Sequence, residues 1–450
     1  MALTGIEIFK KLPKTNCGEC GVPTCLAFAM KLAAGQAELS ACPYVSEEAK
    51  AALEEASAPP IRPLIIGAGD KALKIGGETV MFRHEKRFVS PTGIAVLVSD
   101  EMSDAEVDGR LQKLHELKFE RVGLILQADL VAVKGESGDP AKFEALVKKV
   151  KEKLDGKGVV LISEDPKVLS AGAKAIADRK PLLYAATKAN AEAMAGLAKE
   201  ISAPLAVKAG NLDELAELTT KLTAAGLKDL VLDSGARTAR KALEDHIIIR
   251  RSALVKKFRP LGFPTITFPC EMTNDPMKEA LLASMFVAKY GGIVVLSDLE
   301  GHSLFPLLVE RMNIFTDPQR PMATTEGIYE IGGPGENSPV LVTSNFSLTY
   351  FIVSGEIEGS RIPSWLLVKD TEGLSVMTAW AAGKFGADVI GPFVKKCGIA
   401  NKVKHRKLII PGYAAVISGE LEEELPDWKI FIGPREAGHI PAYLKMWKPE

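Results

Sequence analysis

The sequence predicts an α/β protein of three parts: a small cysteine-bearing N-terminal domain, a central (β/α)8 TIM barrel and a C-terminal doubly wound sheet. Three observations lead to this prediction. Short apolar runs alternate with amphipathic stretches from residue 93 to about residue 320, a second series of apolar runs follows residue 340, and four of the six cysteines fall within the first 42 residues.

The composition is that of a globular protein without a strong charge bias. Of 450 residues, 56 are Lys or Arg and 57 are Asp or Glu, so the net charge is −1. A general nucleic-acid-binding protein usually carries a basic excess. The sequence has no apolar run near the roughly 18 residues that a bilayer crossing requires, and residues 1–12 lack the pattern of a secretory signal. We therefore expect a cytoplasmic protein without nucleic-acid or membrane partners, whose cysteines do not form structural disulfides.

Eight short apolar runs define the central domain. Several segments between them, such as Asp104–Leu117 and Pro140–Leu154, place apolar residues at helical spacing. Eight such strand–helix units in about 230 residues match a closed eight-stranded barrel better than an open doubly wound sheet, which is the alternative. The predicted strands are Ile94–Val98, Val122–Leu126, Val159–Ile162, Leu182–Ala185, Leu205–Val207, Leu230–Leu232, Thr265–Phe268 and Ile293–Leu296.

The C-terminal domain is predicted to follow a stretch rich in Pro and Gly at residues 318–340. Its strand candidates are separated by helical stretches, which predicts an open, doubly wound, Rossmann-like sheet. These candidates are Val340–Thr343, Trp365–Val368, Val389–Ile390, Leu408–Ile410 and Ile430–Ile432.

A linker with short strands is expected between the cysteines and the barrel. Within it, Gly76-Gly77 is expected to turn a hairpin whose return strand is Thr79–Phe82. The expected division of the chain is 1–57 for the cysteine-bearing domain, 58–92 for the linker, 93–325 for the barrel and 326–450 for the C-terminal domain.

The spacing of the N-terminal cysteines is Cys17-x2-Cys20-x4-Cys25-x16-Cys42. Three close thiolates on a loop and a fourth from beyond a helix can enclose an iron–sulfur cubane, whose irons suit soft sulfur ligands. Gly18 and Gly21 allow backbone amides to approach the cluster sulfides. The alternatives are a zinc site, which usually shows two paired ligand knuckles, and simple buried cysteines. Cys270 and Cys397, which stand alone, are expected to be small buried side chains.

The cysteine segment NCGECGVPTCLAFAMKLAAGQAELSACPYV, with MALTGIEIFKKLP shortly before it, resembles the cluster domain of the large (gamma) subunits of corrinoid iron–sulfur proteins. These subunits belong to the reductive acetyl-CoA (Wood–Ljungdahl) pathway of anaerobic carbon fixation. The resemblance covers the whole chain, and related archaeal acetyl-CoA decarbonylase/synthase subunits share the layout. It implies one 4Fe–4S cluster at the four N-terminal cysteines and one corrinoid of the cobalamin type in the C-terminal domain.

The resemblance implies a methyl carrier. Its cobalt would take a methyl group from methyltetrahydrofolate, held by a separate methyltransferase, and pass it to acetyl-CoA synthase. The cluster would return occasional Co(II) to Co(I), with a ferredoxin or a reductive activator as electron donor. A small subunit would complete a heterodimer, for which the barrel of this chain would be the docking scaffold.

Candidate corrinoid contacts follow four strands of the C-terminal sheet, because ligands of open α/β sheets bind outside the carboxyl ends of the strands. Small and hydroxyl-bearing residues there can hydrogen-bond corrin amides and the nucleotide tail, although the same residue types are ordinary in loops. The candidates are Thr343, Asn345, Phe346, Asp370, Thr371, Glu372, Gly373, Leu374, Gly412, Gly433, Pro434, Arg435, Glu436 and Ala437.

Histidine on cobalt from below is not expected. The C-terminal domain has only His405 and His439, and neither lies in an Asp-x-His-x-x-Gly motif. Together with this absence, the resemblance implies a base-off corrinoid without a protein histidine ligand.

Two other functions compete with the methyl carrier. In the first, the chain is itself a methyltransferase whose barrel binds methyltetrahydrofolate through polar residues at the strand ends, such as Asp100, Asp165 and Asp233. These residues are also ordinary helix N-caps, which is the interpretation we favour. In the second, the chain is a reductive activase, but the sequence lacks the phosphate-binding Gly-x-x-x-x-Gly-Lys-Ser/Thr motif of an ATP site.

Overall fold

The computed structural model describes residues 5–33, 37, 39–46, 48–50, 53, 59–121, 123–317 and 321–448. By their contacts, the described residues divide into two compact units. The first unit spans residues 1–81, 89–107 and 129–297, and the second spans residues 82–88, 108–128 and 298–450. The expected domain boundary at residue 57 lies outside the described residues. No helix in these ranges combines the length and the apolar character that a membrane crossing requires.

The cysteine-bearing segment folds around two short helices, α1 (Gly5–Lys11) and α2 (Cys25–Ala33), followed by the 3-10 turn η1 (Leu39–Ala41). Ile8 and Leu12 pack against Phe28 and Ala29 in a small hydrophobic core. The loop between α1 and α2 is thereby held at both ends by one core.

The predicted barrel is present. Its eight strands are parallel and follow the order β10-β9-β8-β7-β6-β3-β12-β11. The ring closes where the amide of Leu232 donates to the carbonyl oxygen of Pro264 at 2.8 Å, beside a bridge between Leu232 and Thr265. The strands are β3 (Gly93–Ser99), β6 (Leu130–Lys134), β7 (Gly158–Ile162), β8 (Leu182–Ala186), β9 (Leu205–Lys208), β10 (Leu230–Asp233), β11 (Ile266–Thr267) and β12 (Ile293–Leu296).

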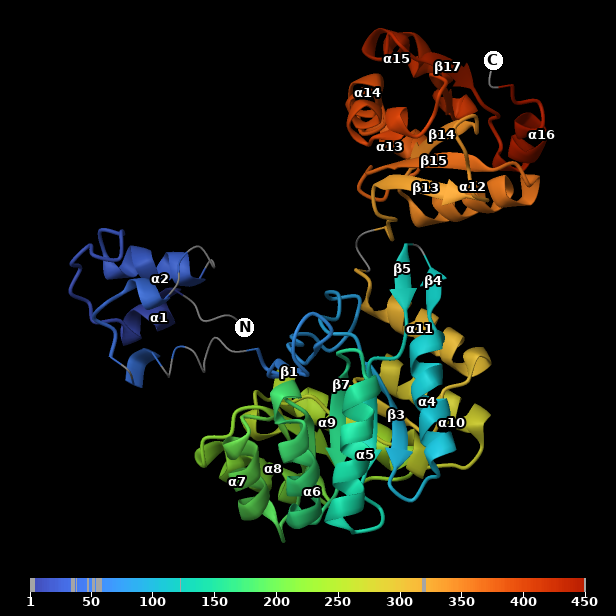
Figure 1. Ribbon diagram of the computed structural model, residues 1–450. Helices are drawn as coiled ribbons and strands as arrows, with labels where there is room; N and C mark the ends of the chain where they lie inside the picture. Colours follow the sequence, from blue (N-terminus) through green and yellow to red (C-terminus); the bar gives the residue numbers. More distant parts are fainter. Residues whose placement is uncertain are drawn as a thin grey trace. The chain divides into compact units, whose positions relative to one another are not determined.

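A helix follows each barrel strand in chain order, which makes every connection a strand–helix–strand unit. In Figure 1 the helices α5 to α9 surround the strands. The eight helices are α4 (Asp104–Glu116), α5 (Pro140–Lys153), α6 (Pro166–Ala175), α7 (Ala191–Glu200), α8 (Leu212–Ala224), α9 (Ala239–Leu254), α10 (Pro276–Ala288) and α11 (Gly301–Phe315).

The prediction of a barrel strand at Val122–Leu126 is wrong. Its described part forms β5 (Leu124–Leu126), which pairs antiparallel with β4 (Phe119–Arg121), and Leu124 and Ile125 are exposed; Val122 lies outside the described residues. The barrel strand is β6, whose residues Leu130–Val133 are fully buried. A strand of a parallel barrel must be buried on both faces. Of the two apolar runs, only Leu130–Val133 meets that condition.

The expected hairpin turn at Gly76-Gly77 is also wrong. The hairpin is formed by β1 (Leu64–Ile66) and β2 (Leu73–Ile75), and Thr79–Phe82 is not a strand. Leu64, Ile66 and Ile75 belong to the same hydrophobic cluster as the barrel interior. The hairpin therefore closes the amino end of the barrel, where Gly93 leaves room for the side chain of Leu73.

The C-terminal part of the second unit is an open five-stranded sheet with the order β13-β15-β14-β16-β17. All pairs are parallel except β13 with β15, which places an antiparallel strand at one edge. The predicted strand Val389–Ile390 is wrong, because it lies inside α14, and the sequence analysis missed β13. The strands are β13 (Gly327–Ile331), β14 (Val340–Ser344), β15 (Ser364–Lys369), β16 (Lys407–Ile410) and β17 (Lys429–Ile432).

Helices cover both faces of this sheet, so it is doubly wound. Successive residues of β14 alternate between two cores: Val340 and Val342 join the core with α14 and α15, whereas Leu341 joins the core with α12 and α16. The parallel strands follow a flavodoxin-type order, which differs from the classic Rossmann order. The helices are α12 (Ser347–Ser360), α13 (Val376–Ala381), α14 (Ala387–Lys396), α15 (Ser418–Glu424) and α16 (Ile440–Leu444).

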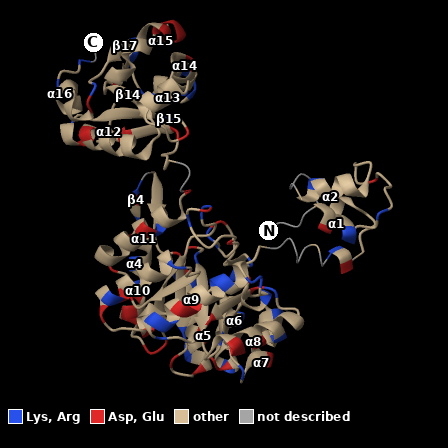
Figure 2. Ribbon diagram, turned by 180° about the vertical axis from the view of Figure 1, so that it is seen from behind, with Lys and Arg blue, Asp and Glu red and all other residues tan. Residues whose placement is uncertain are grey.

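Charged side chains of both signs are intermixed over the barrel helices (Figure 2), as the near-zero net charge predicts. An ion pair beside the segment after β2 is buried instead. Arg250 of α9 and Glu78 are almost fully buried, with 3.2 Å between Nη2 and Oε2. Arg250 also donates to the carbonyl oxygen of Val80, and Glu78 accepts from the amides of Val89 and Ser90. The pair fixes the segment after β2 to the barrel.

The substitution Arg250→Met should therefore destabilise the protein by about 3–5 kcal/mol, because it leaves the Glu78 carboxylate buried without its partner. Urea-induced unfolding followed by circular dichroism measures the loss. The matched control is Arg240→Met on the same helix, since the Arg240 side chain is 91% exposed. Equal transitions for the two variants would show that the buried pair does not stabilise the barrel.

Candidate functional site

The four N-terminal cysteines lie on one small module. Cys17 and Cys20 stand on the loop between α1 and α2, Cys25 is the first residue of α2, and Cys42 follows η1. Cys25 is buried in the core of the module, Cys20 and Cys42 pack against that core, and Cys17 is exposed. The four cysteines, up to 25 residues apart in the sequence, thus belong to one small module.

The loop that carries the thiols has the backbone that a cluster requires. Gly18 and Gly21 have φ values of 77° and 76°, in the left-handed region that glycine adopts readily. The amide of Asn16 donates to Sγ of Cys25 at 3.4 Å, while the Asn16 side chain accepts from the Cys25 amide at 2.8 Å. Amide donors to sulfur are the contacts that tune iron–sulfur clusters, so the donor set fits such a group.

A single metal ion is a poorer match. Among the described residues, no three His, Cys, Asp or Glu side chains are arranged to hold one ion. The thiolates of a cubane bind different irons, so they need not meet at one point. The isolated cysteines differ from the cluster candidates, since burial raises the pKa of Cys270 to about 12 and also raises that of Cys397. The expectation that these two are buried is met only in part, because both are of intermediate exposure.

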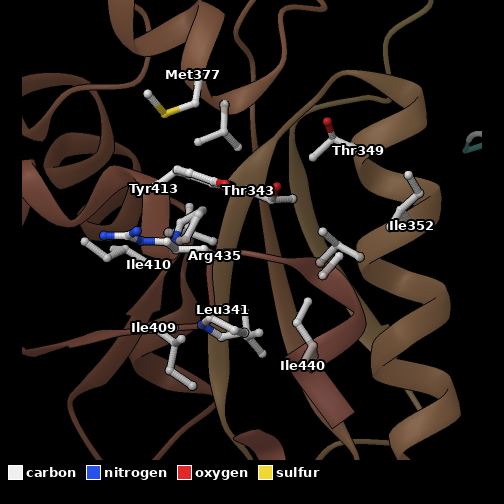
Figure 3. A pocket seen from close by; sticks show the side chains of 17 residues that line it. Leu341, Thr343, Thr349, Ile352, Met377, Ile409, Ile410, Tyr413, Arg435 and Ile440 are labelled. Atoms are coloured by element: carbon white, nitrogen blue, oxygen red, sulfur yellow. The ribbon is translucent and has the colours of Figure 1, made fainter. Parts of the chain in front are cut away.

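The C-terminal sheet holds a cavity of about 230 Å³ at the carboxyl ends of β14 and β16 (Figure 3). These two strands are neighbours in the sheet, but the chain leaves them toward opposite sides, so their carboxyl ends form the topological switch point. The walls come from both strands, from α12 and α13, and from the segments that follow β16 and β17. A crevice at this place is the usual ligand site of an open α/β sheet.

Five of the candidate residues line the cavity: Thr343, Gly433, Pro434, Arg435 and Ala437. Thr343 is 2% exposed, and its Oγ1 has no hydrogen-bond partner within the described part of the chain. A buried hydroxyl without a partner is unfavourable, so a polar atom of a ligand would satisfy it. Gly412 lies directly behind this wall, where a Cβ would be 2.6 Å from the carbonyl oxygen of Gly433.

The other candidates do not line the cavity. Asn345, Asp370, Thr371 and Gly373 instead form a hydrogen-bonded network at the ends of β14 and β15. Glu436 accepts from the hydroxyl of Tyr413 at 2.9 Å. Phe346, Glu372 and Leu374 are also absent from the lining.

The sequence analysis missed most of the apolar lining. Tyr413, Met377 and Ile352 line the cavity and yet remain 49%, 41% and 47% exposed. The sequence alone does not show that these side chains are exposed, because an apolar residue after a strand is ordinarily expected to lie in the core. Further lining residues that were not predicted are Leu341, Val342, Thr349, Val353, Val376, Ile409, Ile410, Pro411 and Ile440.

Neither histidine of this sheet lines the cavity. His405 precedes β16, at the opposite edge of the sheet, and its Nε2 lies 2.8 Å from the carbonyl oxygen of Ser338. Burial lowers the pKa of His405. His439 ends the short turn after β17 and is exposed.

The carboxyl mouth of the barrel contains a buried polar network. Both carboxylate oxygens of Asp233 accept hydrogen bonds: Tyr184 donates at 2.6 Å, Arg237 at 3.0 and 3.2 Å, and the amide of Gly235 at 2.8 Å. Arg237 also pairs with Glu271 and lies over the ring of Phe268. Burial and the Asp233 charge raise the pKa of Tyr184 well above its usual range.

The expectation that strand-end carboxylates cap helices is confirmed in part. Asp165 accepts from the amide of Lys167 at the start of α6. Asp100 instead accepts from Glu136 and Ser137 on the loop after β6, and Asp233 belongs to the network described above.

Comparisons with known proteins match the whole chain. A family described as CO dehydrogenase/acetyl-CoA synthase delta subunit matches residues 63–444, and one described as "Putative Fe-S cluster" matches residues 12–44. The second match contains all four N-terminal cysteines.

Two full-length relatives extend this result. The corrinoid/iron–sulfur protein large subunit of Moorella thermoacetica is 50% identical over 99% of both chains. The acetyl-CoA decarbonylase/synthase complex subunit gamma of Methanopyrus kandleri is 38% identical over 98% of this chain and 97% of its own. Among solved structures, the dihydropteroate synthase of Thermus thermophilus is 13% identical, and the match covers 56% of this chain and 100% of that one. Its TM-score of 0.39 is too low to support a structural comparison. On the full-length matches, the chain belongs to the family of corrinoid/iron–sulfur protein large subunits and acetyl-CoA decarbonylase/synthase gamma subunits.

Proposed function

We propose that the chain is a methyl carrier that holds one base-off corrinoid at its C-terminal sheet and one 4Fe–4S cluster at Cys17, Cys20, Cys25 and Cys42. The observation that carries the proposal is the cavity at the switch point, with its unpartnered Thr343 hydroxyl and its exposed apolar rim. When bound, the corrinoid supplies a cobalt that takes the methyl group of methyltetrahydrofolate from a separate methyltransferase and gives it to acetyl-CoA synthase.

The size of the cavity decides which part of a corrinoid enters. Its volume of about 230 Å³ is below the range for a drug-sized ligand, so a whole corrinoid cannot be enclosed. The nucleotide tail would enter between β14 and β16, where Thr343 offers a hydroxyl. The macrocycle would then cover the exposed side chains of Met377 and Tyr413 at the rim. No histidine is among the described residues that line the cavity, which supports the proposal of a base-off corrinoid without a protein histidine ligand.

The cysteine module would hold the cluster, which supplies the electron that returns Co(II) to Co(I). Cys25 is fixed by α2 and by the reciprocal bonds with Asn16, while the left-handed glycines keep side chains away from the loop backbone. A cluster on a separate small module is suited to a reaction that occurs only when the cobalt has been oxidised.

The barrel would act as a scaffold. Asp233, one of the strand-end carboxylates that could receive a pterin, already accepts hydrogen bonds from four donor groups within the protein. We therefore favour the carrier over a methyltransferase with its own methyltetrahydrofolate site. The proposed partners of this cytoplasmic chain are a small subunit in a heterodimer, the methyltransferase, acetyl-CoA synthase, and a ferredoxin or reductive activator.

The first test is metal content. The purified protein should contain about one cobalt and about four irons per chain, and its visible spectrum should be that of a base-off corrinoid. A spectrum with histidine on cobalt would contradict the proposed lower face, and a protein without cobalt would contradict the function.

The second test separates the cluster from the corrinoid. Cys20→Ala should keep its corrinoid and accept methyl groups after chemical reduction, because the C-terminal sheet is unchanged. It should not recover from Co(II) with a protein electron donor. Cys397→Ala is the matched control and should recover like the wild type; full recovery by the Cys20 variant would show that the cluster is not the reductant.

The third test addresses the barrel. At about 1 mM, methyltetrahydrofolate should neither bind the isolated chain in equilibrium dialysis nor raise its unfolding temperature, because a ligand stabilises only the state that it binds. Tight binding that Asp233→Asn abolishes would favour the methyltransferase instead.

A further inference from the structure

We propose that Asn345 is a positioning residue for the corrinoid: it fixes the loop 370–374, and through it the α13 wall of the cavity, without touching the ligand. This inference rests on the proposed function, since it takes a corrinoid as the occupant of the cavity. It also revises the prediction from sequence, in which Asn345, Asp370, Thr371 and Gly373 were candidate contacts.

The side chain of Asn345 is engaged in four hydrogen bonds inside the protein. Its Oδ1 accepts from the amide of Thr371 at 3.0 Å, from the hydroxyl of Thr371 at 2.9 Å and from the amide of Gly373 at 3.0 Å. Its Nδ2 donates to Oδ1 of Asp370 at 2.8 Å. Asn345 is 3% exposed and Thr371 is fully buried, so water does not replace these bonds. An amide engaged in this way has little capacity left for a ligand.

The loop 370–374 connects Asn345 to the wall of the cavity. The amide of Leu374 donates to the carbonyl oxygen of Thr371, and the Thr371 hydroxyl lies 2.8 Å from the carbonyl oxygen of Leu374. α13 begins two residues later, and its first two residues, Val376 and Met377, line the cavity. Gly373 has φ of 77°, and a Cβ there would lie 2.9 Å from the carbonyl oxygen of Pro321. The loop 370–374 is therefore tightly packed between Asn345 and the α13 wall of the cavity.

The backbone of Asn345 is fixed from the other side as well. Its carbonyl oxygen accepts from the amide of Thr324 at 2.8 Å, and the amide of Ser347 donates to the carbonyl oxygen of Met322 at 3.0 Å. Residues 322–324 thus run beside the end of β14, and the preceding Pro321 lies against the loop at Gly373. Because its backbone and its side chain are both fixed, Asn345 sets where the wall stands relative to Thr343, which is two residues before it on β14.

The test compares two corrinoids, cobalamin and cobinamide, which lacks the nucleotide tail. In the full-length protein freed of corrinoid, Asn345→Ala should weaken cobalamin binding at least about tenfold, because the buried amides of Thr371 and Gly373 lose their acceptor and the wall moves. Cobinamide has no tail to enter the cavity and contacts the wall only at its rim, at Met377, so its affinity should fall clearly less than that of cobalamin. Absorption titration measures both affinities, and iron content and the unfolding midpoint report the fold.

Two further variants keep the test decisive. Asn345→Asp keeps the size and the acceptor but places a second carboxylate beside Asp370, so it should also weaken cobalamin binding; adding Asp370→Asn should restore part of the affinity. Ser344→Ala is the matched control, because its buried hydroxyl has no hydrogen-bond partner among the described residues and its loss leaves the network intact.

The outcomes separate the inference from the function on which it rests. If the wild type binds cobalamin and the Asn345 variants bind it equally well, the positioning role is wrong. It is also wrong if both corrinoids are lost in parallel with a lower unfolding midpoint, since that is a merely structural effect. A wild-type protein that binds neither corrinoid overturns the proposed function itself.

Discussion

The reversal of strand order between β14 and β16 is the constraint on which the C-terminal site depends. From β14 the chain passes through α12 to β15 on one side, and it later returns to β16 on the other side. No connection can cross the carboxyl ends of these two strands, so a crevice remains between them. The buried hydroxyl of Thr343 faces that crevice without a partner in the described chain. The geometry of the sheet thus creates both the space and the unsatisfied polar group that a ligand would complete.

The barrel is built from the same kind of strand–helix units, but its strands close into a ring with a filled interior. Tyr184 and Phe268 are in edge-to-face contact near the mouth. The polar groups there satisfy each other around Asp233 and Arg237. A mouth of this kind stabilises the fold. Under the proposed function, the two α/β sheets of the chain would divide the work, with one binding a cofactor and the other serving as a scaffold.

Much of the fold could be predicted from the sequence, because buried parallel strands are continuous apolar runs. Seven of the eight predicted barrel strands overlap a strand of the ring, and the eighth was displaced because Leu124 and Ile125 are apolar but exposed. Strand order could not be predicted, since it depends on contacts between distant segments; the edge strand β13 was missed for this reason.

The candidate site was predicted less completely. Polar residues after the strands led to Thr343 and Arg435, which line the cavity, but also to Asn345, whose side chain turns into the protein. A single sequence does not tell whether an asparagine after a strand faces a ligand or holds a loop. Nor does it reveal that Met377 and Tyr413 remain exposed at a rim, because the same residues would be core in another packing.

The most direct test of the account is a structure of the corrinoid-loaded protein. We predict density for the nucleotide tail between the carboxyl ends of β14 and β16, with the macrocycle over Met377 and Tyr413 and with no histidine on cobalt. A corrinoid found at the mouth of the barrel, or one whose tail lies outside the cavity beside Thr343, would contradict it.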